Sequence, residues 1–423
     1  MKIKFILFSF SFLILSSCQQ LSRWLDLTPT EEFNSFVKTG QYCEGPTEFQ
    51  IIGSNPLANK QFVNEIIKKN KSFDLYSLAA MLSLFQMDIR PEQSGPSSRI
   101  QFFIYDGKKW LYRDFNNSIT QQKNQNNFPF MAGLKWLASK SPEKELYKIA
   151  QRFDQISPKY IFVGPVFAKW LDKNKDQFLK SDSFREHFFK GDQVVIYGES
   201  IESLNHTKIV QTFAPKQDQI NVFTDLPFSQ QSKDKSVSYS CNFDPKIYQE
   251  MILLNEDPQN INANVFGFKF KTGEIFIGIS MQKNPQINQK TDQFLLASDN
   301  PIRPVPFCFV ETKNNKLAIM GNGGIDPAQH IMQLIDLDLD QVQTAKEYEQ
   351  RLMQARTLFL VRPARMAVET KLISNERLAE LHHFQLPLYH SDALGEIWTW
   401  LSLPNQSTFI ADPRHERGIQ CIP

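Results

Sequence analysis

The stretch VFGFKFKTGEIFIGISM, from Val265 to Met281, decides the fold class. Two runs rich in β-branched and aromatic residues, 265–270 and 275–281, flank the turn Lys271-Thr272-Gly273-Glu274. This pattern predicts a β-hairpin. Two further hairpins are expected on the same grounds: 99–105 with 110–115 across Asp106-Gly107, and 305–311 with 316–320 across Asn314-Asn315. Strands joined by tight turns form antiparallel sheets.

Helices are expected in runs separate from these hairpins, where apolar residues recur every three or four positions. They lie near 56–67, 75–85, 130–139, 142–153, 165–189 with a break, 341–356 and 374–384. Single strands are expected at 48–52, 194–197, 207–213, 220–223, 358–361, 395–402 and 407–411. Segregated hairpins and helices predict an α+β fold. The polar stretch 226–236 predicts a boundary between two α+β domains, 43–228 and 236–423.

The first eighteen residues contain three zones. Met1 to Lys4 carries positive charge, Phe5 to Leu15 is largely apolar, and Ser16-Ser17-Cys18 consists of residues with small side chains. A run of about eleven residues is shorter than the roughly 20 that a permanent membrane-spanning helix needs. Residues 1–17 are therefore expected to be a cleavable secretory signal peptide.

The sequence Leu15-Ser16-Ser17-Cys18 resembles the lipobox of bacterial lipoproteins. The resemblance implies a diacylglyceryl group on the Cys18 thiol, cleavage after Ser17, and a membrane partner bound through this lipid. Residues 18–42 would then form the lipidated cysteine and its tether. Gln19 differs from the Asp associated with inner-membrane retention, which implies the outer membrane. The alternative is an ordinary signal peptide with an incidental Cys18.

Charge and cysteine content narrow the possible partners. Without Lys2 and Lys4, basic and acidic residues are equal in number, so no nucleic-acid partner is expected. No C-x-x-C pair exists, which disfavours redox and zinc motifs, and no metal or cofactor is predicted. Apart from Cys18, the chain has four cysteines, which permit two disulfides outside the cytoplasm. The expected pairs are Cys241 with Cys308 and Cys43 with Cys421. Separate buried thiols are the alternative.

The densest polar chemistry lies near the carboxyl end. His383, His390, Asp412 and His415 are the candidates for a histidine base oriented by a carboxylate. Their spacing fits no metal motif, and a structural role for most of them is the alternative.

Two other motifs have simpler interpretations. Gly321 to Gly324 precedes Asp326-Pro327, which suggests a tight turn with an Asp N-cap rather than a phosphate-binding loop. Trp398 and Trp400 share one strand face and are expected in the core rather than on a sugar-binding platform.

Three functions remain open from the sequence. The first is a non-catalytic envelope lipoprotein that acts through protein contacts or structural support. The second is a lipid-anchored periplasmic hydrolase that uses the histidine and aspartate candidates. The third is a ligand-binding lipoprotein.

Overall fold

A computed structural model describes most of the chain after the expected tether. The described residues are 40–69, 73–116, 128–180, 182–214, 221–223, 226–231, 237–249, 263–282, 286–287, 296–297, 304–324, 326–361, 364–391, 393–414 and 418–423. The signal peptide, Cys18 and His415 lie outside them.

A seven-stranded antiparallel sheet is built around the hairpin 265–281. Its order is β22 (Ile419–Ile422), β1 (Phe49–Gly53), β11 (Asn264–Phe270), β12 (Ile275–Met281), β2 (Arg99–Tyr105), β3 (Trp110–Asn116), β8 (Asn221–Phe223). The hairpins β11–β12 and β2–β3 are confirmed, with Val265 opposite Ile279 and Ile100 opposite Phe115. Gly267 is required in β11, because a Cβ there would lie 2.4 Å from the Phe276 carbonyl oxygen.

A second sheet has six antiparallel strands. Its order is β21 (Gln406–Ala411), β20 (Glu396–Leu403), β16 (Lys316–Asn322), β15 (Phe307–Thr312), β10 (Val237–Cys241), β9 (Phe228–Gln231). The third predicted hairpin is confirmed as β15–β16, with Glu311 opposite Lys316. Together with the helices, these sheets confirm the α+β class.

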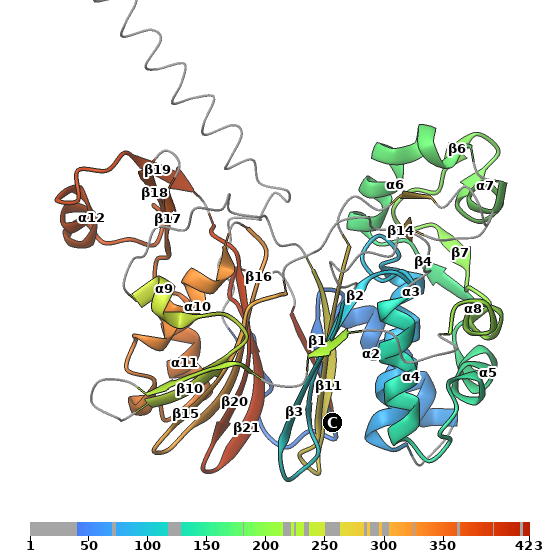
Figure 1. The fold of residues 1–423 in the computed structure, drawn as a ribbon, viewed down its shortest axis with the longest axis horizontal. Coiled ribbons are helices and arrows are strands. Elements are labelled where there is room, and N and C mark those ends of the chain that lie inside the picture. The colour runs from blue at the N-terminus through green and yellow to red at the C-terminus, as the bar shows by residue number, and fades with distance from the viewer. Residues whose placement is uncertain are drawn as a thin grey trace, which may run out of the picture.

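The two sheets face each other and form the middle of four layers (Figure 1). Between them, Ile277 and Phe103 from one sheet share a buried core with Phe307, Trp398 and Trp400 from the other. Trp398 is fully buried and Trp400 is 4% exposed, as the core interpretation predicts. Strands buried on both faces explain why β12 is apolar at nearly every position rather than alternating.

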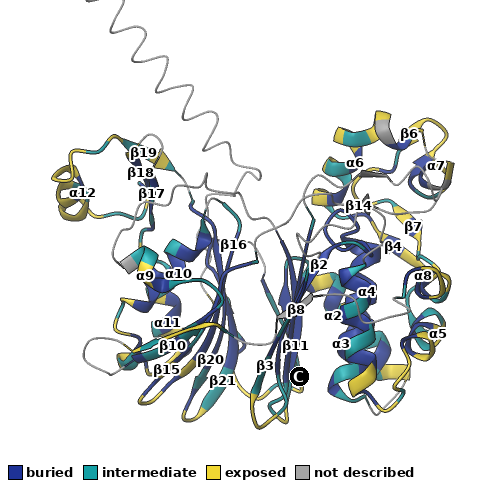
Figure 2. Ribbon diagram, viewed as in Figure 1, coloured by how far each residue is buried: buried dark blue, intermediate teal, exposed yellow. Residues whose placement is uncertain are grey.

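Helices cover the outer face of each sheet. The seven-stranded sheet packs against α2 (Pro56–Lys69), α3 (Leu75–Ile89) and α4 (Pro129–Lys140), and α5 (Leu146–Ile156) packs on these helices. The other sheet packs against α10 (Pro327–Ile335) and α11 (Ala345–Leu352). In Figure 2 the central strands of the two large sheets are almost entirely buried, whereas exposed residues concentrate on the outer helices and on two projecting lobes. The core therefore lies on both faces of both sheets.

One expected strand, 207–213, is wrong. The segment forms α8 (His206–Phe213), which packs against α5. Asn205 caps this helix by accepting a hydrogen bond from the Lys208 N–H at 2.8 Å, and Asp154 accepts one from the Thr207 N–H. These caps satisfy the free N–H groups of a helix start, which favours helix over strand.

Two lobes project from the same end of the sandwich (Figure 1). The β17–β19 lobe contains β17 (Thr357–Val361), β18 (Ala364–Glu369), α12 (Asn375–His382) and β19 (Leu388–Ser391). The α6–α7 lobe contains β4 (Tyr160–Phe162), α6 (Pro165–Phe178), α7 (Asp182–Phe188), β5 (Phe189–Lys190), β6 (Gln193–Val194) and β7 (Ser200–Glu202). The remaining described elements are α9 (Pro245–Gln249), β13 (Gln286–Ile287), β14 (Leu296–Ala297) and the short 3-10 helix Leu339–Gln341.

Two disulfides have the expected pairing. Cys241 and Cys308 join adjacent positions of β10 and β15, and Cys43 joins Cys421 in β22 across 378 residues of sequence. Disulfides are typical of oxidising compartments outside the cytoplasm. None of the described helices is long and apolar enough to cross a bilayer.

The expected domain boundary does not coincide with the boundary between the sheets. β11 and β12 follow residue 236, yet they lie at the centre of the sheet that contains β1, β2 and β3. The chain therefore passes between the sheets more than once, and the division into two domains stays a prediction.

Candidate functional site

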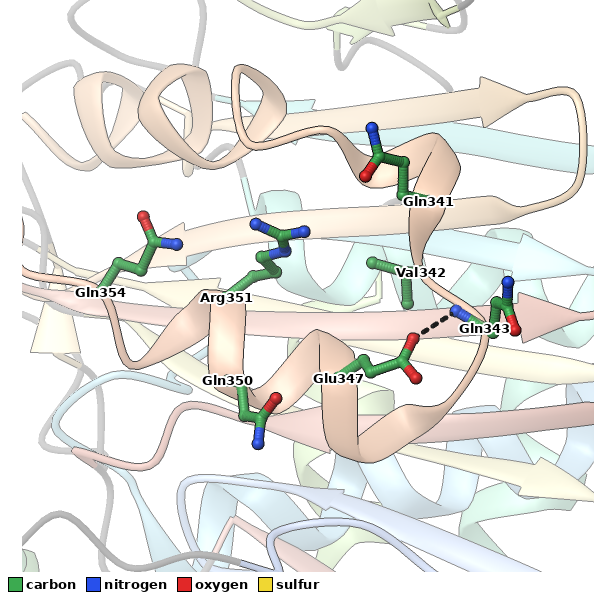
Figure 3. A pocket seen from close by; sticks show the side chains of 7 residues that line it. All are labelled: Gln341, Val342, Gln343, Glu347, Gln350, Arg351 and Gln354. Atoms are coloured by element: carbon green, nitrogen blue, oxygen red, sulfur yellow. Dashed lines mark hydrogen bonds between the residues drawn. The ribbon is translucent and has the colours of Figure 1, made fainter.

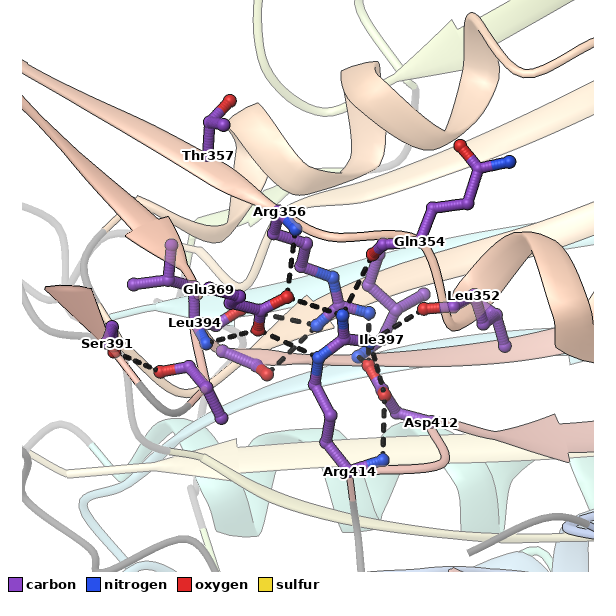
Figure 4. A network of polar contacts seen from close by, with 12 residues as sticks. Leu352, Gln354, Arg356, Thr357, Glu369, Ser391, Leu394, Ile397, Asp412 and Arg414 are labelled. Carbon is purple, nitrogen blue, oxygen red and sulfur yellow. Dashed lines mark hydrogen bonds and ion pairs between the residues drawn. The ribbon is translucent and has the colours of Figure 1, made fainter. Parts of the chain in front are cut away.

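Asp412 lies in a buried network of charges between the six-stranded sheet and the β17–β19 lobe (Figure 4). We call Arg356, Glu369, Asp412 and Arg414 the charged clamp. Arg356 forms an ion pair with Asp412, and Arg414 pairs with both Asp412 and Glu369. All four side chains are at most 5% exposed. Two positive and two negative charges thus neutralise one another in the interior.

Backbone groups complete the charged clamp. Glu369 accepts hydrogen bonds from the N–H groups of Arg356 at 2.8 Å and Leu394 at 2.6 Å. Asp412 accepts one from the Ile397 N–H at 2.8 Å. Arg414 donates to carbonyl oxygens at the end of α11 and beyond it, on Leu352 and Gln354. The clamp therefore fastens α11, β18 and β20 to the end of β21.

These contacts fix the charge of Asp412. Burial alone would raise its pKa, but Arg356 and Arg414 outweigh burial and hold the pKa of Asp412 below its usual range. A carboxylate that is already held by two guanidinium groups is a poor partner for a histidine base.

The predicted histidines lie elsewhere. His383 is exposed at the carboxyl end of α12, and His390 is exposed in β19. The contacts described for Asp412 are made by arginine side chains and backbone N–H groups. The structure therefore separates a buried Asp412 from exposed His383 and His390.

Among the described residues, two other histidines are buried. His206 lies between Asp88 and Asp154, at 3.3 Å and 3.2 Å from their carboxylates. Burial alone would lower the pKa of His206, but the two carboxylates raise it; burial in turn raises the pKa of Asp88 to about 6. His330, on α10, has a pKa held well below its usual range by burial and by Arg356.

A second buried polar cluster lies where β11 begins and β12 ends. We call Asn59, Gln86, Ser94, Asn264 and Ser280 the neutral edge; all five side chains are fully buried. Asn264 donates through Nδ2 to Gln86 at 3.0 Å and to Ser94 at 3.1 Å. The hydroxyls of Ser94 and Ser280 lie 2.6 Å apart. Sequence patterns did not reveal this cluster, because its members come from α2, α3, a loop and two strands.

The neutral edge retains unused hydrogen-bonding capacity. Among the described residues, neither Oδ1 of Asn264 nor Nδ2 of Asn59 has a hydrogen-bond partner. The hydroxyl groups of Ser94 and Ser280 bond to each other, and that of Ser94 also accepts from the Asn264 amide. The hydroxyl of an activated nucleophile is instead paired with a general base.

Asn322 joins the two sheets beside the neutral edge. Its Oδ1 accepts from the Ala263 N–H at 2.9 Å, and its Nδ2 donates to the Ala263 carbonyl at 3.0 Å. Ala263 immediately precedes β11, while Asn322 ends β16. One side-chain amide thus satisfies both main-chain groups at the point where β11 begins.

The loop after Asn322 is a tight turn. Gly323 and Gly324 have φ values of 70° and 71°, which favour glycine. Asp326 stands at the expected N-cap of α10, but its side chain accepts no backbone hydrogen bond there. It accepts instead from the Tyr248 hydroxyl at 2.8 Å. The turn is confirmed, and the capping contact is corrected.

A surface pocket of about 520 Å³ lies along α11 (Figure 3). Its lining is mostly polar: Gln341, Val342, Gln343, Glu347, Gln350, Arg351 and Gln354. Glu347 accepts from the Gln343 N–H at 2.7 Å and donates its own N–H to the Thr344 hydroxyl. These two bonds satisfy N–H groups on either side of the N-cap Thr344, so the start of α11 explains this part of the pocket.

Comparisons with known proteins concern the fold. No protein-family model matches the chain, and no curated protein is significantly similar in sequence. A cephalosporin acylase from Bacillus halodurans is similar in structure, at 11% identity, with a TM-score of 0.55 over 89% of this chain and 95% of that one. The structure of LmbA2991HD is similar at 7% identity, with a TM-score of 0.58 over 93% of this chain and 100% of that one. At such identities the likeness concerns the fold alone.

Proposed function

We propose that this protein is a lipid-anchored envelope protein that works by contact with other envelope components rather than by catalysis. The observation that carries the proposal is the pairing of Asn322 with both main-chain groups of Ala263. This pairing occupies the N–H and the carbonyl of Ala263, where the two sheets meet. At the neutral edge nearby, Ser94 and Ser280 bond to each other. The fold is similar to that of a cephalosporin acylase. The polar side chains of Asn322, Ser94 and Ser280 form hydrogen bonds within this fold.

A chemical test separates contact from catalysis. The purified protein is incubated with covalent probes for activated serine, threonine and cysteine, namely a fluorophosphonate, a β-lactam and a chloroacetamide. The proposal predicts an unchanged intact mass. A single adduct that forms in the folded protein, but not in protein denatured in urea before the probe is added, would reveal an activated nucleophile and contradict it.

The lipid anchor is a separate part of the proposal. It rests on the sequence Leu15-Ser16-Ser17-Cys18, and the two disulfides are compatible with a location outside the cytoplasm. Metabolic labelling with palmitate is expected to mark the wild type but not Cys18→Ala. Equal labelling of both would remove the anchor from the proposal.

An amide hydrolase is the second candidate. The likeness to a cephalosporin acylase over most of both chains favours it. Such an enzyme would draw on the hydroxyls of Ser94 or Ser280, since Asp412 is held by two arginines. Hydrolysis of amide-linked side chains of cephalosporins, abolished in Ser94→Ala or Ser280→Ala but kept in Ser229→Ala, would establish this candidate over the first.

A further inference from the structure

Large apolar side chains gather on the surface of the α6–α7 lobe. Tyr160, Phe162, Val166, Ile196 and Tyr197 are 54%, 70%, 38%, 63% and 68% exposed, and we call these five the exposed patch. Single exposed apolar residues are ordinary, but a group of them marks a contact surface.

Backbone pairing brings the β4 members of the exposed patch beside Ile196 and Tyr197. In β4, Tyr160 and Phe162 point outward while Ile161 between them is buried. Directly after β4, Val163 exchanges backbone hydrogen bonds with Gly198 and Glu199. The turn that carries Ile196 and Tyr197 therefore lies beside the end of β4.

This turn is held rigidly. Glu199 accepts a hydrogen bond from the Ile196 N–H at 2.8 Å through one carboxylate oxygen. Its other oxygen binds the Lys190 ammonium at 2.7 Å. Gly198, with a φ of 85°, permits the reversal of the chain. Ile196 and Tyr197 are thus presented to solvent by a fixed turn, which lowers the entropic cost of binding.

The exposed patch lies at the end of the molecule where the chain enters the body. Gln41 and Tyr42 pair with the last two residues of β21, just before Asp412. Asp412 binds Arg356 beneath the β17–β19 lobe, and Figure 1 places both lobes at the same end. Gly40 lies 22 positions after Cys18, a span of at most about 79 Å. A membrane at this end is within reach of the expected tether.

The composition of the surface favours an apolar contact over an electrostatic one. Residues 159–202 contain as many acidic as basic residues. Tyrosines beside Phe and Ile are typical of the membrane interface, where the rings sit among the headgroups. On the other lobe, Phe384 follows α12 and is 55% exposed. Both lobes therefore offer an aromatic side chain at the same end.

We propose that the exposed patch inserts into the interfacial region of a phospholipid bilayer and orients the body against it. The idea rests on the proposed lipid anchor for its biological setting, but the patch itself binds lipid without the anchor. Binding through apolar side chains depends on buried area and only weakly on salt.

The experiment uses the chain from Gln19 onward, which contains every described residue and no acyl group. Flotation with phosphatidylcholine and phosphatidylethanolamine vesicles measures its partition, at low salt and at high salt. The patch variant carries Phe162→Ser, Ile196→Ser and Tyr197→Ser. The matched control carries Leu57→Ser and Phe228→Ser, two apolar residues outside the patch that are 46% and 37% exposed. Circular dichroism verifies that all three proteins are folded.

The wild type and the control are expected to float to the same extent at both salt concentrations. The patch variant is expected to partition at least about tenfold more weakly, because three apolar side chains are lost. Absence of wild-type flotation, or equal flotation of wild type and patch variant, would overturn the proposal. So would a wild-type dimer that the patch variant dissociates, since the patch would then bind a second copy. Palmitate labelling of the full chain reports on the anchor separately.

Discussion

The charged clamp and the neutral edge are both fully enclosed polar clusters, yet they satisfy their groups differently. In the clamp, every charged side chain meets an opposite charge, and backbone groups take up the remaining positions. In the neutral edge, Asn264 and Asn59 each keep an atom without a described partner. A broken charge pair leaves an ion in the interior, whereas a lost amide contact leaves only a dipole. The clamp should therefore dominate stability.

The largest effect is expected for Asp412→Asn. The change keeps the size of the side chain but leaves Arg356 and Arg414 with excess positive charge in the interior. Breaking a buried pair costs about 3–5 kcal/mol. Urea unfolding measures this loss, with Glu311→Gln as the control, because Glu311 forms an exposed pair with Lys316 worth about 1 kcal/mol or less. A loss below that of the control would show that the clamp contributes little.

The pH dependence of unfolding is expected to separate the two clusters. The pKa of Asp412 is lowered in the folded protein, so its contribution is present above its unfolded value of 3.8 and is lost as pH falls below it. Between pH 7 and pH 3, the wild type should lose more stability than Asp412→Asn. Ser280→Ala should follow the wild type, because no side chain of the neutral edge ionises. Parallel curves for Asp412→Asn and wild type would contradict this assignment.

A smaller loss is expected for Asn322→Ala. The substitution leaves the N–H and carbonyl of Ala263 without partners in the interior, at a cost of about 2–4 kcal/mol. Asn314→Ala, in an exposed turn, should change the free energy of unfolding by about 0.5 kcal/mol or less. If the two variants unfold alike, Asn322 does not hold the sheets together.

The smallest effect belongs to the neutral edge itself. Ser280→Ala removes one hydroxyl contact with Ser94, so the expected loss of stability is about 1 kcal/mol. Ser229 and Ser240 form a similar hydroxyl pair, 2.9 Å apart, on the surface, and Ser229→Ala should be nearly neutral. A loss in Ser280→Ala as large as that in Asp412→Asn would erase the contrast between the clusters.

Local sequence patterns predicted the hairpins well because turn chemistry and alternation act over a few residues. They could not predict that β2 pairs with β12, since residues 99–105 and 275–281 are far apart in sequence. The apolar residues of 207–213 predict a strand although a helix signal is present: Asn205 stands at the N-cap position. In so short a segment, the apolar residues fit the period of a helix as well as that of a strand. The N-cap signal is therefore the more informative one.

The candidate site was harder to predict than the fold. The sequence groups Asp412 with histidines that lie near it in the chain, while its partner Arg356 lies 56 residues away. The neutral edge carries no titratable group, and amide and hydroxyl side chains are too common in a sequence to indicate a site. Such clusters become visible only when the strands are in place. The cysteines were predictable because two pairs among four allow few arrangements.

The Cys43–Cys421 disulfide also determines how the body would respond to mechanical force. A pull on the N-terminal segment reaches the fold at Gln41 to Cys43. From there it passes through hydrogen bonds to β21 in the six-stranded sheet and through the covalent bond to β22 in the seven-stranded sheet. Tension is thus divided between both sheets at once. A pull on the N-terminal segment is therefore not expected to detach β1 from its sheet first.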